Sequence, residues 1–179
     1  MTSIHTRREG GFTLLELLLV IGVAALLLIG GIATYRLVSD GNKATEATRL
    51  LLTLRQEAAT MAQQNGGDYT GITYDTTTDD DNNVFVAAGI LRNQQRNPFN
   101  GNITIAPNGT NLIDITFENV SRSSCVKLFT AITNPNEIDS VTVNGGTQRL
   151  ANADPSPLTA TNAAVDCSAA TNTVLWTLK

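Results

Sequence analysis

The sequence of 179 residues contains few histidines, cysteines and basic residues, and each shortage excludes a class of function. The single histidine, His5, cannot by itself supply a histidine-ligated metal site or a histidine-dependent catalytic triad. Twelve basic and sixteen acidic residues give a net charge of −4, which is the wrong sign for a nucleic-acid-binding protein. The sequence also lacks a polar constellation typical of an active site, so we expect no enzymatic activity, no metal and no cofactor.

The hydrophobic residues, 42% of the chain, are concentrated near its start. Residues 12–35 read FTLLELLLVIGVAALLLIGGIATY, and nineteen uncharged residues lie between Glu16 and Arg36. A helix of that length spans about 28 Å, close to the thickness of a bilayer core. Arg7 and Arg8 precede the run, so we expect the N-terminus in the cytoplasm and the rest of the chain outside. A secretory signal peptide is the alternative, but no small-residue cleavage site followed by a polar segment ends the run.

Glu16 is the unusual residue in this run, because a carboxylate is costly in an apolar environment. One interpretation places Glu16 in the first turn of a membrane helix, where the helix dipole favours a negative charge. The other is functional, because charged residues inside a membrane segment commonly mark functional sites. A plain signal anchor would require neither Glu16 nor the Gly11–Phe12 pair before it.

The stretch from Gly11 to Glu16, GFTLLE, resembles the prepilin signature of type IV pilins and pseudopilins. This resemblance implies that a membrane-embedded prepilin peptidase cuts after Gly11, that the new amine of Phe12 is methylated, and that Glu16 is needed for assembly. Residues 1–11 are then a leader that is removed, and residues 12–35 lie first in the membrane and later in a filament core. A carboxylate from an adjacent subunit would relieve the cost of burying the Phe12 amine in that core.

Helical periodicity continues beyond the apolar run. Small and apolar residues recur at spacings of three and four: Ala44, Ala47, Leu51, Leu54, Ala58 and Met61. Asn65-Gly66-Gly67 ends this pattern, so we expect one long helix over residues 12–65, amphipathic in its second half. Its weak points are Gly30, Gly31 and Gly41, because glycine has low helix propensity. The narrow, alanine-rich stripe favours packing under a sheet of the same chain over dimerisation.

The remaining residues, 66–179, predict a globular head, so that the whole chain is α+β with the long helix packed on an antiparallel sheet. Strands are expected at Asn102–Ala106, Leu112–Phe117, Ile138–Val143, Thr147–Leu150 and Thr173–Leu178, and helices at Val84–Arg92 and Ser121–Thr133. Turns are expected at 97–101, 107–110 and 144–146, and loops at Asp75–Asn83 and Ala151–Ser168. The acidic loop lacks the ligand spacing of a calcium-binding loop.

Cys125 and Cys167 lie on the outer side of the predicted membrane helix, where disulfides persist. A Cys125–Cys167 bridge would close a loop of about 43 residues and stabilise the protein by roughly 4 kcal/mol on the chain-entropy account. Two unpaired buried thiols are the alternative. A catalytic cysteine would have no histidine partner beyond the membrane helix.

The order of elements in the head resembles that of type IVb pilins, and most of all the PilS-type subunits of thin pili. The features that carry this resemblance are NPFNG at 97–101, a cysteine that opens a helix, VNGG at 143–146, a second cysteine and a terminal strand. It implies a major pilin that leaves the bacterial inner membrane to polymerise into an extracellular helical filament for adhesion, aggregation or conjugative mating.

The partners that this resemblance implies are further copies of the chain, prepilin peptidase, an inner-membrane assembly platform with a cytoplasmic ATPase, an outer-membrane secretin, and a host or recipient cell surface. The short leader and Phe12 are more typical of type IVa pilins and pseudopilins, so a minor pilin or pseudopilin is the alternative within the superfamily. The alternative from another class is a membrane-anchored periplasmic binding domain that never polymerises.

Overall fold

The computed structural model describes residues 13–132, 134–151 and 157–179, without the side chains of residues 32–34, 36 and 37. The chain divides into two compact units, Met1–Ser39 and Asp40–Lys179. One helix, α1 (Leu14–Gln64), contributes residues to both units and matches the expected long helix over the described residues. The expected cleavage site at Gly11 and Phe12 lies outside the described residues.

The first part of α1 is apolar and uncovered. The 18 residues Leu14–Gly31 have a mean hydropathy of 2.6, and none of them is buried. By length and composition this segment can cross a membrane. The helix continues without a break through Gly30, Gly31 and Gly41, the positions expected to be its weak points.

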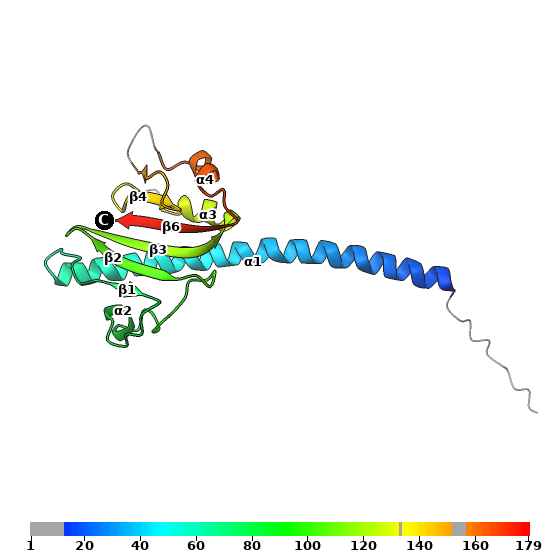
Figure 1. Ribbon diagram of the computed structural model, residues 1–179, viewed down its shortest axis with the longest axis horizontal. Coiled ribbons are helices and arrows are strands. Elements are labelled where there is room, and N and C mark those ends of the chain that lie inside the picture. The colour runs from blue at the N-terminus through cyan, green and yellow to red at the C-terminus, as the bar shows by residue number, and fades with distance from the viewer. Residues whose placement is uncertain (1–12, 133, 152–156) are drawn as a thin grey trace, which may run out of the picture. The chain divides into compact units, whose positions relative to one another are not determined.

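In the second unit, α1 packs its small-residue stripe against the sheet. The buried members of the stripe are Ala44, Ala47, Leu51, Leu54, Ala58 and Ala62. The stripe is therefore confirmed except at its end, where Met61 is only half-buried and Ala62 occupies the buried position. Ala62 lies four residues after Ala58, so it continues the same helix face. Figure 1 shows this part of α1 crossing one face of the sheet.

The sheet has six strands in the order β1-β2-β3-β6-β4-β5, and all neighbouring strands are antiparallel. The strands are β1 (Tyr74–Asp75), β2 (Ile103–Asn108), β3 (Leu112–Ser121), β4 (Ile138–Val143), β5 (Arg149–Leu150) and β6 (Thr171–Leu178). The C-terminal strand is thus central, with β3 on one side and β4 on the other. Alternate residues of these strands point toward α1 and form the core, in which Phe117 and Trp176 stack edge to face at 5.4 Å.

The structure corrects the first hairpin. The turn expected at 107–110 lies at 109–111 instead, because β2 continues through Pro107 and Asn108, which pair with Ile113 and Leu112. The backbone of Ile103 faces β1, since its carbonyl accepts a hydrogen bond from the Thr76 N–H (3.0 Å). Pro107 lies four residues after Ile103, so its backbone nitrogen faces the same side of β2. That side is the outer edge of the sheet beyond the end of β1, where no N–H donor is required.

Three short helices complete the head: α2 (Val84–Ala87), α3 (Arg122–Phe129) and α4 (Ala160–Asp166). The helix expected at 84–92 is shorter because Gly89, with φ of 71°, turns the chain. The helix expected at 121–133 is present as α3 but ends at Phe129, and residue 133 lies outside the described residues. The loop expected at 151–168 is wrong in its second half, which forms α4. Thr159 caps α4 by accepting a hydrogen bond from the Asn162 N–H at 3.2 Å.

The turn before β2 is built around a buried amide. The side-chain oxygen of Asn97 accepts hydrogen bonds from the N–H groups of Phe99 (2.9 Å) and Gly101 (3.1 Å). Its Nδ2 donates to the carbonyl of Glu118 at 2.8 Å, which ties the turn to β3. A Cβ atom at Gly101 would collide with this same Glu118 carbonyl, so only glycine fits the position.

We expect Gly101→Ala to lower the free energy of unfolding by about 1–3 kcal/mol, because the added methyl forces the turn away from β3. Gly41→Ala is the matched control: its Cβ would meet only the flexible end of Lys127 at 3.7 Å, and alanine stabilises a helix interior. Denaturant unfolding of the two variants, followed by Trp176 fluorescence, measures the difference. Equal stability of the two variants would contradict the collision at Glu118.

Candidate assembly site

The start of α1 is capped by Thr13. The Thr13 side-chain oxygen accepts a hydrogen bond from the Glu16 N–H at 3.3 Å, and the Thr13 carbonyl accepts from the Glu16 and Leu17 N–H groups. Since the helix begins at Leu14, Glu16 is its third residue, and Thr13-x-x-Glu16 has the spacing of a capping box. This role of Thr13 was not predicted from the sequence, although the Thr-x-x-Glu spacing is a local signal for it.

The Glu16 carboxylate is exposed and has neither an ion pair nor a hydrogen bond with any residue that the structure describes. Its neighbours Leu14, Leu15, Leu17 and Leu18 are all more than half exposed. The helix dipole stabilises a carboxylate here by about 0.3–1 kcal/mol, whereas desolvation of an ion costs several kcal/mol. In an apolar environment the helix dipole alone therefore does not offset the cost of desolvating an ionised Glu16 carboxylate.

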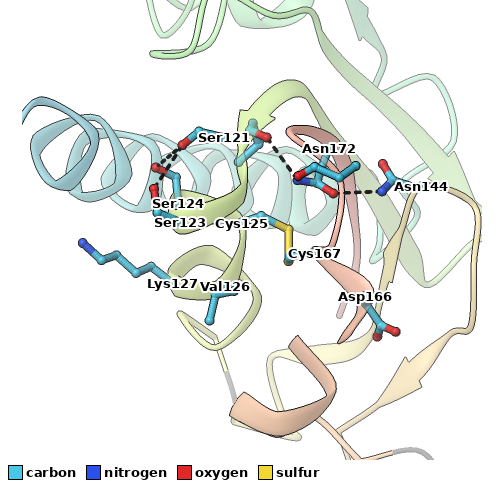
Figure 2. The surroundings of a disulfide bond; sticks show 12 residues. Ser121, Ser123, Ser124, Cys125, Val126, Lys127, Asn144, Asp166, Cys167 and Asn172 are labelled. Carbon is cyan, nitrogen blue, oxygen red and sulfur yellow. Dashed lines mark hydrogen bonds between the residues drawn. A yellow bond between two sulfur atoms is a disulfide. The ribbon is translucent and has the colours of Figure 1, made fainter. Parts of the chain in front are cut away.

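A disulfide joins Cys125 of α3 to Cys167 at the end of α4 (Figure 2). Both cysteines are fully buried and their Cα atoms are 5.8 Å apart, so the expected pairing is confirmed. The bond connects residues separated by 42 positions and fixes the segment that contains α4 against α3.

Polar contacts reinforce the same region. Arg149 of β5 binds Asp166, the neighbour of Cys167, through two parallel hydrogen bonds of 2.7 and 2.9 Å. The hydrogen bond from Arg149 to Asp166 raises the pKa of the guanidinium, which stays charged at all physiological pH values. On the other side of the disulfide, the Asn144 amide donates to the Asn172 side chain at 2.9 Å (Figure 2).

Asp40 fastens the beginning of the head to α3. Its carboxylate accepts hydrogen bonds from the hydroxyls of Ser123 (3.1 Å) and Ser121 (3.4 Å), and its backbone carbonyl accepts from Ser124 (3.2 Å). A negative charge at the N-terminus of α3 is also favoured by the helix dipole. This role of Asp40 could not be predicted from the sequence, because its partners lie more than eighty residues away and no local signal connects them.

The acidic loop after β1 is closed by hydrogen bonds within the head. Asn93 donates to the carboxylates of Asp79 (2.5 Å) and Asp81 (2.8 Å), and its side-chain oxygen accepts from the Asp80 N–H. Among the residues that the structure describes, no group of three or more histidine, cysteine, aspartate or glutamate side chains is placed to hold a metal ion.

Comparisons with known proteins agree with this geometry. The PilS N-terminal family profile matches residues 55–179, and the prokaryotic N-terminal methylation motif matches residues 6–32. A type IVb pilin from Salmonella typhi is 20% identical with a TM-score of 0.52, covering 76% of this chain and 97% of its own. TcpA, a type IV pilin from the Vibrio cholerae El Tor biotype, is 17% identical with the same TM-score and covers 76% and 98%. No curated protein matches the sequence.

The long helix packed on an antiparallel sheet, with the N-terminal motif, defines the class of type IV pilins. Since the profile covers more than half of the sequence, the chain belongs to the PilS family. It is a structural subunit that polymerises into a pilus and not an enzyme. The expectation of an α+β pilin is thereby confirmed.

We expect Cys125→Ser and Cys167→Ser to lower the free energy of unfolding by about 2–5 kcal/mol, because the unfolded chain gains freedom. Val165→Ser is the control: its side chain is 63% exposed, so the change should leave stability nearly unaltered. Thiol titration of the denatured protein should find two free thiols only after reduction. Two free thiols before reduction would show that the bond is absent.

Proposed function

We propose that the chain is made as a prepilin and cut after Gly11 by prepilin peptidase, which releases the leader 1–11. The new N-terminal amine belongs to Phe12 and is methylated. The methylation-motif match at residues 6–32 supports this processing. Cleavage there leaves Thr13 in place to cap α1, so processing does not cost the helix its N-cap.

The observation that carries the proposal is the unpartnered Glu16 carboxylate in a helix of exposed leucines. When such helices pack together, both the carboxylate and the Phe12 amine lose water. A pair between Glu16 of one subunit and the amine of Phe12 of a neighbour compensates both charges. Because each subunit offers one amine and one carboxylate, the pair also fixes the axial stagger between neighbours.

In this proposal residues 12–35 hold the subunit in the bacterial inner membrane and later fill the filament core, while residues 36–65 complete the helix and residues 66–179 form the outward head. An inner-membrane platform with a cytoplasmic ATPase drives assembly, and an outer-membrane secretin provides the exit. The side chains of Leu14–Gly31 are not buried within the chain, so they need lipid or neighbouring helices around them. This supports a location in the membrane before assembly and in the filament core afterwards.

The assembled filament is a PilS-type pilus on the cell surface, in which this chain is the major subunit. Its use in adhesion, aggregation or conjugative mating follows from the resemblance to thin pili, and its external partner is a host or recipient cell surface. The family match over residues 55–179 supports this assignment over a pseudopilin.

Mass spectrometry of purified filaments should find a subunit of 168 residues, the 179 residues of the chain without its 11-residue leader. The subunit should begin at Phe12 and carry one methyl group on its amine. A bulky residue in place of Gly11 should leave uncut precursor in the membrane. Filaments that contain Met1, or that begin near Tyr35, would contradict this processing.

Glu16→Gln and Glu16→Ala should both be cut, remain in the inner membrane and form few or no filaments. Loss of the carboxylate leaves a buried amine without a partner, which costs about 3–5 kcal/mol at each added subunit. Electron microscopy and counts of surface pili measure this loss. Glu46→Ala is the matched control, because Glu46 is an exposed carboxylate on the same helix within the head. Abundant filaments of Glu16→Ala subunits alone would leave only the helix-dipole role.

A further inference from the structure

Charge is unevenly distributed over the second unit, Asp40–Lys179. Residues 40–49, at the start of this unit, and residues 121–130, around α3, together carry four basic and two acidic residues. The rest of the unit, residues 50–120 and 131–179, carries five basic and twelve acidic residues. Positive charge is thus concentrated where the chain enters the head, and the remainder of the head is acidic.

The contacts of α3 bring these two segments together. Asp40 accepts hydrogen bonds from Ser121 and Ser123, as described above. The Lys127 ammonium lies 3.7 Å from the point where a Cβ would stand on Gly41. Figure 2 shows Lys127 extending from α3 on the side opposite the disulfide. We call Lys43, Arg122 and Lys127 the basic collar.

The basic collar has no carboxylate partner in the part of the chain that the structure describes. All three side chains are exposed, and none forms an ion pair with a carboxylate among the described residues. Arg55, Arg149 and Lys179 pair with Glu137, Asp166 and Asp139. Arg49, Arg92 and Arg96, like the basic collar, form no ion pair among the described residues. Of the two acidic residues in the same segments, Asp40 is engaged by serine hydroxyls and Glu46 is exposed.

The sequence limits how far the start of the head can lie from the apolar window. Only eight residues lie between Gly31, the last residue of the apolar window, and Asp40. Even a fully extended link of that length spans no more than about 30 Å. Tyr35 and Arg36 lie within the link, and aromatic and basic residues after an apolar run are typical of the membrane–water interface.

We propose that the basic collar binds anionic phospholipid headgroups on the outer face of the inner membrane while the subunit awaits assembly. This inference rests on the membrane stage of the proposed function. The attraction acts within a Debye length of about 8–10 Å, so it holds the α3 end of the head against the lipid. The acidic remainder of the head is repelled by the same surface. The head is therefore presented in one orientation to the filament that it joins.

The three lysines of the chain provide the test, since Lys43 and Lys127 belong to the collar and Lys179 is the C-terminal residue. The full-length chain is placed in nanodiscs of phosphatidylcholine, or of phosphatidylcholine with an equal share of phosphatidylglycerol. Acylation of each lysine by an amine-reactive reagent is followed by mass spectrometry. We expect Lys43 and Lys127 to react roughly fivefold more slowly in the anionic nanodiscs at low salt, and high salt to remove the difference. Lys179 should react equally in both.

A charge variant tests the cooperation within the basic collar. Arg122→Gln with Lys127→Gln should abolish the lipid-dependent protection of Lys43. The control Arg92→Gln with Lys179→Gln removes the same charge elsewhere and should leave that protection unchanged. Equal rates at Lys43 in both nanodiscs would overturn the proposal. Slow acylation of Lys43 that is the same in both lipids, but becomes slower with more subunits in each disc, would also overturn the proposal. It would indicate a contact between copies of the chain instead. A chain that enters neither nanodisc would instead overturn the membrane stage itself.

Discussion

The whole subunit depends on one constraint on α1. The first part of this helix needs apolar surroundings on all sides, whereas its later part needs them along one face only. Its first part, Leu14–Gly31, is apolar on every side, so no face of it can be left in water. Its later part is apolar only along the stripe from Ala44 to Ala62, which the sheet covers. The small side chains of that stripe let the sheet approach closely, and polar residues occupy the rest of the helix surface. In the polymer proposed above, the first part of α1 is buried between copies and the heads keep their fold.

The edges of the sheet offer few unpaired backbone groups to a strand of another chain. An exposed strand edge is a template for pairing with other chains. Here both edge strands, β1 and β5, are only two residues long. Beyond β1, the outer edge of β2 carries Pro107, which offers no N–H to an incoming strand. Association through the helices is thereby favoured over association through sheet edges.

The features predicted correctly from the sequence are those with a local signal. The spacing from Ala44 to Ala58 revealed the buried helix face, and the alternation in Ile138–Val143 located β4 to the residue. The errors have physical causes. Helix α4 lies within a segment of small residues and prolines whose composition is typical of a loop, and only the Thr159 cap marked its start. The contacts of Asp40 with α3, and the place of β6 in the sheet, join residues too distant for any periodicity to reveal.

The central position of β6 makes the head depend on a strand that follows the other strands in the sequence. The eight residues of β6, Thr171–Leu178, pair with both β3 and β4. Until they arrive, Val174, Trp176 and Leu178 are missing from the core and the two flanking strands have no connection through the sheet. The Cys125–Cys167 bond likewise joins a helix before β4 to the segment that leads into β6. In the sequence, α1 precedes every strand of the sheet and β6 follows all the other strands. The core of the head is therefore complete only when β6 lies between β3 and β4.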